Sequence, residues 1–330
     1  MLIESLLRRA YAAWLTFWFP APAPQGTLAL LRIGTALLLI YVLFVRSFDL
    51  DTPFSRAVWA DPETLHQLDP IAWPFSLFGW SESTVWMWTL HGLAMLVAMA
   101  FLLGVLTPLA AALSLLLQLS YAHQNPAMLL GVDGLLILAL AYLSLVSSGR
   151  VLGVFARDTP GTPEYPPYLS YLKDEQTRGG AGDWPWSGLP LRLLQLHLSL
   201  LYLHSALAKL TTDWVAGTAL WHPRGLPGGA LYGFETLHAA PYLAGTVATG
   251  LLLFELLYAV LIWVRPLRYP LLVLALGVHL GVGFTWNLVP FNLLLLVLNL
   301  VFVPVAHVEA MVRFIRPLLV LPWVVNDREG

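Results

Sequence analysis

Long apolar stretches recur along the whole chain and alternate with shorter polar segments. A helix that crosses a membrane needs about 20 predominantly apolar residues. Eight stretches approach this length, several of them near its lower limit, and we expect each to be a membrane-spanning helix. They are residues 26–45, 84–103, 109–121, 128–146, 191–210, 242–264, 271–284 and 291–305. The pattern therefore predicts an all-α fold, a polytopic membrane helical bundle of about eight transmembrane helices.

The first 25 residues follow a different pattern, in which aromatic side chains come after Arg8 and Arg9. Aromatic residues favour the headgroup region, and the segment lacks the small-residue cleavage site of a signal peptide. We therefore expect an interfacial amphipathic helix and linker over residues 1–25. The transmembrane domain then covers residues 26–310, and residues 311–330 form a short cytoplasmic tail.

The composition agrees with a membrane protein. The chain is 58% hydrophobic and only 11% charged, whereas about a quarter of the residues of a soluble domain are charged. The net charge of −2 and the absence of a basic run give no support for a nucleic-acid partner. The chain has no cysteine, which excludes disulfides and thiolate metal sites. The expected environment is therefore the lipid bilayer.

The basic residues predict an orientation. If the N-terminus is cytoplasmic, eight spans place most lysines and arginines on the cytoplasmic side and only four on the other side, as the positive-inside rule requires. The four are Arg46, Arg56, Lys209 and Arg224. We thus expect both termini in the cytoplasm and Lys209 on the extracytoplasmic side.

A stripe of polar side chains follows the fifth expected span. Gln195, Tyr202 and Lys209 recur every seven residues and so share one face of a helix, and His197 and His204 form a second such pair. Polar groups are costly against lipid, so the first stripe should face the bundle interior. Two interpretations of Lys209 are open. A lysine in a cavity loses solvation, which favours the neutral amine and lets it act as a base; alternatively, Lys209 extends to the membrane surface, as lysines at helix ends often do.

Other spans carry polar side chains that can share a cavity with Lys209. A buried Glu255 can pair with Lys209 or with a histidine, or remain neutral, whereas Asp133 and Glu255 can also serve only as hydrogen-bonding groups in helix packing. Glycines around His279 would permit close helix approach. These residues are His123, Gln124, Asn125 and Asp133 near the fourth span, Glu255 and Tyr258 on the sixth, Gly277, His279, Gly281 and Gly283 on the seventh, and Asn287 and Asn292 beside the eighth.

Familiar catalytic motifs are absent from the sequence. It contains no HExxH or comparable spacing, so no metal site is expected. It also contains no P-loop, no dinucleotide-binding GxGxxG and no GxSxG elbow.

The segment YLHSALAKLTTDWVAG, residues 202–217, resembles the signature of the HTTM domain, the membrane domain shared with vitamin K-dependent gamma-carboxylase. Lys209 matches the catalytic lysine of that segment. Weaker matches follow in the same order as in the family, and the resemblance covers roughly residues 26–310. They are Arg32, Ile33 and Gly34 at the first span, HQN and GVDG around the fourth, Glu255 on the sixth and His279 on the seventh.

The resemblance implies a role for Lys209 as a general base. In the carboxylase the lysine deprotonates reduced vitamin K, the oxygenated product takes a proton from a glutamate side chain, and CO2 adds there. The implied cofactor is reduced vitamin K or another quinone, and the implied catalytic residues are Lys209, His279 and Glu255. We expect the cofactor to be bound by the polar and aromatic residues near this cavity, namely Tyr202, Gln195, Trp214, His123, Asn125 and Asp133.

The carboxylase has a large lumenal portion after its membrane domain, whereas this chain ends soon after the eighth expected span. It is closer in size to short bacterial family members, which include proteins similar to a maturation factor for a sporulation-delaying toxin. Three functions are therefore open. The first is a bacterial inner-membrane enzyme with carboxylase-like or monooxygenase-type chemistry on a secreted peptide or small substrate. The second is a non-catalytic maturation, export or immunity partner for a secreted peptide, and the third is a small-molecule or proton carrier that uses Asp133, Glu255 and His279.

Overall fold

The computed structural model of this chain describes residues 24–50, 76–81, 83–124, 129–149, 151–154, 188–215, 218 and 241–319, together with residues 11, 14 and 17. All regular secondary structure in these residues is helical. The predicted all-α class is therefore confirmed for the described part of the chain.

Each of the eight expected spans contains a helix. Of the described helices, four are long and apolar enough to cross a membrane, namely α2 with the short helix η1, α4, α10 and α11. The chain is thus an integral membrane protein by its helices, and the crossing of the bilayer by the other four stays a prediction. One of these, α6, has 14 residues, about 21 Å at 1.5 Å per residue, against a hydrocarbon core of about 30 Å. The bounds are α2 (Gln25–Arg46), η1 (Ser47–Asp49), α4 (Thr84–Leu102), α5 (Thr107–Gln124), α6 (Gly131–Ser144), α7 (Gly188–Ala208), α10 (Pro241–Leu261), α11 (Arg265–Thr285) and α12 (Val289–Leu298).

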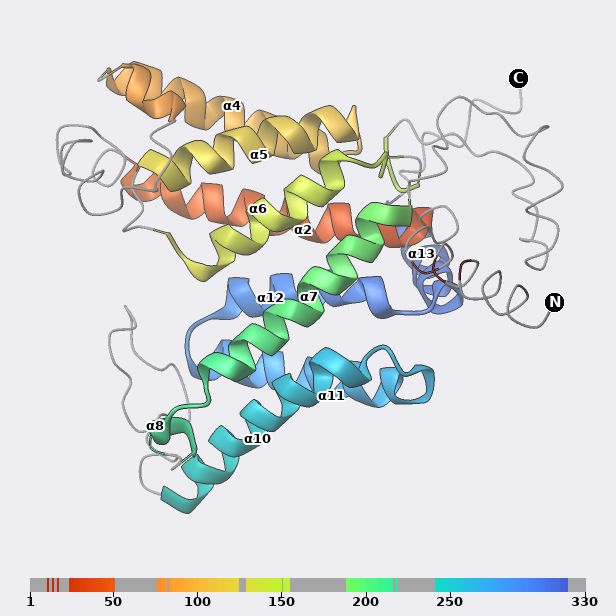
Figure 1. Cartoon of the computed structure of the whole chain (residues 1–330). Helices are drawn as coiled ribbons and strands as arrows, with labels where there is room; N and C mark the ends of the chain where they lie inside the picture. Colours follow the sequence, from red (N-terminus) through yellow and green to blue (C-terminus); the bar gives the residue numbers. More distant parts are fainter. Residues whose placement is uncertain are drawn as a thin grey trace, which may run out of the picture.

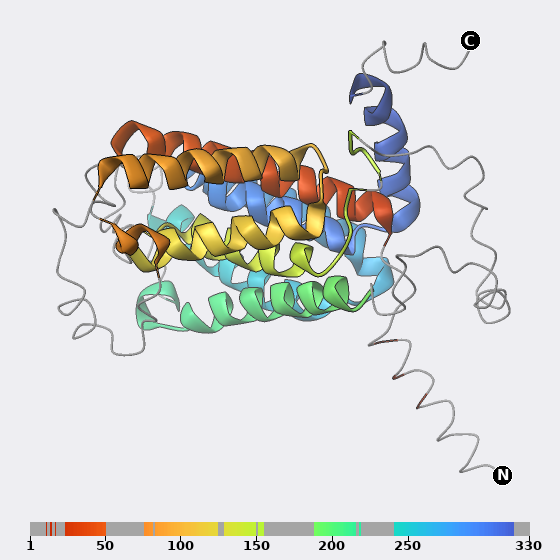
Figure 2. The same cartoon turned by 90° about the horizontal axis from the view of Figure 1, so that it is seen from above.

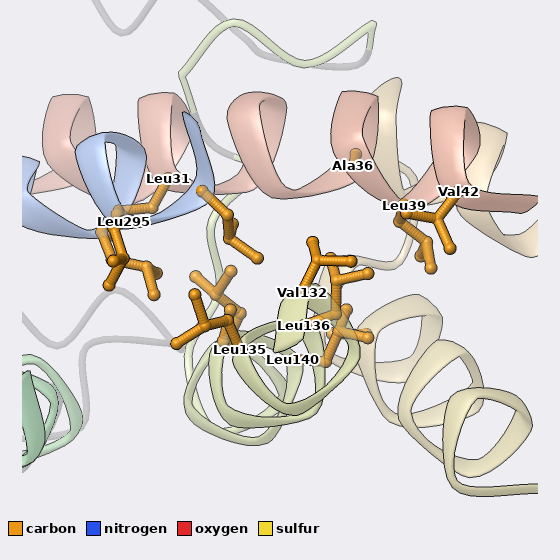
Figure 3. Packing of buried hydrophobic residues seen from close by; sticks show 14 of the residues in the cluster. Leu31, Ala36, Leu39, Val42, Val132, Leu135, Leu136, Leu140 and Leu295 are labelled. Atoms are coloured by element: carbon orange, nitrogen blue, oxygen red, sulfur yellow. The ribbon is translucent and has the colours of Figure 1, made fainter. Parts of the chain in front are cut away.

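The helices form two groups that meet at α12. Figure 1 shows α2, α4, α5 and α6 on one side and α7, α10 and α11 on the other, with α12 between them. Helix α12 contacts α2 and α6 as well as α11. In Figure 3, leucines of α2, α6 and α12, among them Leu31, Leu136 and Leu295, point toward one another. Because one hydrophobic cluster joins the two groups, the bundle behaves as a single packed unit.

A buried arginine fixes one end of the bundle. Arg32 of α2 is fully buried and donates hydrogen bonds to the backbone carbonyls of Ser148, Val151 and Leu152, which follow α6. A short turn joins α4, which ends at Leu102, to α5, which begins at Thr107. Gly104 in this turn has a φ of 78°, and a Cβ there would lie 2.8 Å from Arg32 Nη1. Only glycine suits both constraints.

Several shorter elements complete the structure. They are η2 (Leu77–Trp80), α8 (Thr212–Val215) after α7, and η5 (Asn299–Phe302) and α13 (Val305–Leu319) after α12. Residues 311–319, expected to belong to a short tail, are instead the second half of α13. Three residues of the expected interfacial helix, Tyr11, Trp14 and Phe17, are helical and exposed. The rest of that helix, and most of the polar segments 46–83 and 148–189, lie outside the described residues.

Candidate functional site

The side chain of Lys209 turns back toward the bundle. Its ammonium nitrogen lies 2.9 Å from Oε1 and 2.7 Å from Oε2 of Glu255 on α10, and it donates a third hydrogen bond of 2.6 Å to Oγ of Ser205. All three ammonium protons thus have acceptors. Nζ also lies 5.3 Å from the centre of the Trp214 ring, within range of a cation–π interaction. The Lys209 side chain thus points toward α10.

The ion pair lies well inside a membrane-spanning helix. Glu255 follows the start of α10 at Pro241 by 14 residues and precedes its end at Leu261 by six. At 1.5 Å per residue the carboxylate is about 21 Å from one end of this helix. Lys209 follows the last residue of α7, but α8 continues along α10, where Trp214 packs against Ala244 and Ala248. The end of α7 is therefore covered by protein, and Lys209 and Glu255 are only 19% and 17% exposed.

A second set of polar side chains lies one to two helical turns away from the ion pair, partly on the same helices. Tyr202 of α7 shares a 2.6 Å hydrogen bond with Nε2 of His279 on α11, and Nδ1 of His279 lies 2.9 Å from Oδ1 of Asn292. Nδ2 of Asn299 donates to the Tyr202 hydroxyl, and the Tyr258 hydroxyl donates to Oδ1 of Asn299. These five side chains join α7, α10, α11, α12 and η5 in one buried network.

The donor and acceptor roles in this network can be assigned from its end at Asn292. The amide of Asn292 donates to the carbonyl oxygen of Leu288, so its Oδ1 must accept from His279. His279 therefore carries its proton on Nδ1, and a neutral ring leaves Nε2 to accept from the Tyr202 hydroxyl. Every polar atom of the His279 ring is then satisfied. The Phe254 ring, next to Glu255 in the chain, contacts the rings of Tyr202 and His279.

The expected polar face of α7 is confirmed. Gln195 donates to the carbonyl oxygen of Val301, while Tyr202 and Lys209 bond to α11 and α10, so all three members of the stripe bond to other parts of the bundle. His197 and His204 of the second pair are exposed. Gln195 thus ties α7 to η5, away from the Lys209 amine.

Asp133 belongs to a different cluster. Its Oδ1 accepts from Arg46 at 2.8 Å and from Gln118 at 2.7 Å, and its Oδ2 accepts from the backbone nitrogen of Leu130 at 2.9 Å. These partners come from α2, α5 and the residue before α6, so the structure does not bring Asp133 to Lys209. His123 lies in the last turn of α5, and Asn125 lies outside the described residues.

An apolar groove of about 640 Å³ runs between α10 and α11. Val247 and Leu251 line it from α10, and Gly277 and Gly281 line it from α11. The expectation that Gly277 and Gly281 permit close helix approach is wrong, because a Cβ at either position would meet nothing within 4 Å. Only Gly283 is close to a neighbour, with Cβ of Asn292 at 3.2 Å.

The groove extends to the side chains that pack beside Trp214, the residue that covers Lys209. Val247, which lines the groove, and Trp214, which covers Lys209, pack on the same two alanines, and Trp286 at the end of the groove joins them. Leu251 precedes Glu255 by one turn of α10. Lys209 and Glu255 are not themselves among the residues that line the groove. Among the described residues, no group of three or more metal-ligating side chains lies together.

Two members of these sites were missed in the sequence. Ser205 lies four residues before Lys209, a spacing that places both on one helix face and would have identified it. Asn299 is a single amide within an apolar stretch, which is itself a sign of a functional or packing role in a membrane.

Comparison of the chain with family models, curated protein sequences and solved structures finds no match.

Proposed function

We propose that the chain is a membrane-embedded enzyme of the HTTM type in which Lys209 acts as a general base toward a reduced quinone or a similar lipidic cofactor. The observation that carries the proposal is the position of the Lys209 amine. It is held by Glu255 and Ser205 inside the bundle, next to a groove suited to a hydrocarbon chain. A base in such a site is poorly hydrated, which increases its tendency to react.

The pair supplies a route to the neutral amine. Glu255 Oε2 lies 2.7 Å from Nζ, so a proton can pass from the ammonium to the carboxylate without movement of either side chain. The amine then accepts a proton from an acidic hydroxyl: the O–H bond breaks and an N–H bond forms. The ammonium that results keeps Ser205 as an acceptor and Trp214 as a cation–π partner.

The residues of the groove fit a lipidic cofactor. Val247, Leu251 and the open surfaces of Gly277 and Gly281 would hold its hydrocarbon tail, and Trp286 and Trp214 would lie near its ring. A reduced quinone supplies an acidic phenolic hydroxyl and two electrons for reaction with oxygen. We assign Tyr202 and His279 the role of positioning residues, because their hydrogen bonds fix α7 against α11.

The wider setting is part of the same proposal. The chain lies in a bacterial inner membrane with both termini in the cytoplasm, which places Lys209 on the extracytoplasmic side. In Figure 1, α8 lies at the end of the bundle opposite to α13, in keeping with this orientation. The substrate is then a secreted peptide or a small molecule, modified by carboxylase-like or monooxygenase-type chemistry.

One alternative is a proton carrier, for which the hydrogen-bonded network would have to be the proton path. Its donors all point the same way, from Tyr258 through Asn299, Tyr202 and His279 to Asn292. The network ends on the carbonyl oxygen of Leu288, which has no proton to pass on. A rigid packing element explains this network better than a proton path does. A non-catalytic peptide-binding role for the same cavity is the second alternative.

The test uses purified protein in lipid vesicles with reduced vitamin K and oxygen. We expect consumption of the quinol and epoxide formation by the natural chain, and loss of both with Lys209→Ala. His204→Ala is the matched control, since it removes an exposed polar side chain from the same helix. Equal turnover by the Lys209→Ala variant would refute the base role. Quinol binding without turnover in the natural chain would favour the non-catalytic function.

A further inference from the structure

Helix α13 lies across one end of the bundle. Figure 2 shows that it runs across the direction of the long helices. Its buried side chains, Val308 and Val312, pack against the first turns of α2, where a Cβ on Gly26 would lie 3.3 Å from Val312. Because α2 is a candidate membrane span that begins at Gln25, α13 is at the level where the bilayer starts.

The remaining surface of α13 has two opposite stripes. On one flank Met311 and Phe314 are 41% and 77% exposed. On the other flank lie Glu309 and Arg313, and both are exposed. The buried stripe separates the two flanks. One apolar face of α13 therefore meets protein, and a second apolar face is exposed at Met311 and Phe314.

The arrangement matches the bilayer surface. An interfacial helix keeps large apolar side chains in the acyl region and charged ones in the headgroup region. His307 shares a 3.0 Å hydrogen bond with the hydroxyl of Tyr269 in α11, which fixes α13 beside the basic start of that helix. Arg265 and Arg268 lie there, and they add to the charge of Arg313 at this end of the molecule. Juxtamembrane arginines attract anionic lipids.

We propose that α13 is an interfacial helix that inserts Met311 and Phe314 into the bilayer and binds anionic lipid headgroups through Arg313. The occupant of the exposed apolar stripe is thus lipid, and neither a second copy of the chain nor a soluble protein. This inference is independent of any reaction at Lys209.

Because the chain has no cysteine, single spin labels can be placed directly. The experiment uses the full chain in phosphatidylcholine vesicles with and without phosphatidylglycerol, labelled at Phe314→Cys or at Glu309→Cys. Leu96→Cys, at a position 70% exposed on α4, gives the reference for hydrocarbon depth. We expect the label at 314 to collide with oxygen rather than with a water-soluble nickel chelate, as at 96, and the label at 309 to show the reverse.

Two further results decide the matter. Access of the nickel chelate to both labels would show that α13 stands in water, and protection of the label at 314 from both reagents would show a protein partner. Either result overturns the proposal.

For the headgroups, spin-labelled phosphatidylglycerol should be enriched over phosphatidylcholine around the protein. Arg313→Gln should lower that preference up to about fivefold. A preference unchanged in this variant would refute the binding of anionic lipid.

Discussion

Two ion pairs lie within the bundle, and they are built in different ways. Asp133 is fully buried, and three donors occupy its two oxygens while the Arg46 guanidinium lies over the Tyr121 ring. The Lys209–Glu255 pair is partly exposed, and an open apolar groove reaches Leu251, one turn before Glu255 on α10. The first pair is enclosed by its partners, whereas the second is partly open.

The choice of cation follows the same division. Arginine keeps its proton under all ordinary conditions, so Arg46 is suited to a permanent bond with a carboxylate. Lysine gives up its proton when it is poorly solvated, and an amine is a base. We infer that the Arg46 pair stabilises the fold and that the Lys209 pair performs chemistry. Each prediction below would break or sharpen that division.

The largest expected effect is that of Lys209→Arg. The positive charge and its attraction to Glu255 are kept, but the guanidinium does not act as a base, so turnover should fall at least about a hundredfold. The thermal unfolding midpoint should change little. The measurement is quinol consumption together with thermal unfolding in detergent.

Arg46→Lys is the matched substitution in the other pair, and it should leave turnover nearly unchanged. Full activity in the Lys209→Arg variant would mean that the lysine serves only as a charge. The division between the two pairs would then fail.

Removal of Asp133 should have the largest effect on stability. Asp133→Ala leaves the Arg46 charge without its carboxylate, and the loss of one partner from a buried pair lowers the free energy of unfolding by about 3–5 kcal/mol. Equilibrium unfolding in mixed micelles measures it. Replacement of both residues by apolar ones, Arg46→Met with Asp133→Leu, should recover most of the loss. Lys209→Ala should cost clearly less, and an equal cost would place both pairs in the structural class.

The tyrosine–histidine contacts give a smaller and more local test. Tyr202→Phe removes a hydroxyl that both His279 and Asn299 use, and a buried group left unpaired costs about 1–3 kcal/mol. Tyr142→Phe is the control, since its 3.3 Å contact with His197 is exposed and its loss should cost less than about 0.5 kcal/mol. Unfolding measurements on both variants check the difference. Equal effects would show that the buried network contributes no more than a surface contact.

The sequence predicted the helices better than it predicted the contacts between them. Apolar runs separated by Pro, Gly and charged residues define α2, α4 and α10 within a few residues, because a hydrocarbon environment demands such runs. Helix α11 begins at Arg265, six residues before the expected start of its span, and contains Pro270. The seven-residue spacing also predicted the inward face of α7. Which helices meet is set by packing among many similar apolar surfaces, so the separation of Asp133 from Lys209 was not readable. The amphipathic pattern of α13 was present in the sequence and was missed because the residues were assigned to a tail.

The smallest expected effect separates two glycines of α11 that look alike in the sequence. Gly281 faces the groove with nothing within 4 Å of a Cβ, whereas a Cβ on Gly283 would lie 3.2 Å from Asn292. Gly281→Leu should therefore fold normally and even gain up to about 1 kcal/mol of helix propensity. Its side chain would occupy the groove, so quinol binding should weaken about tenfold, a loss of about 1.4 kcal/mol.

Gly283→Leu should lose about 1–3 kcal/mol of stability by overpacking. Calorimetric titration and thermal unfolding of the two variants measure these effects. Unchanged quinol affinity in Gly281→Leu would remove the groove from the proposed site and leave Lys209 without a place for a lipidic cofactor.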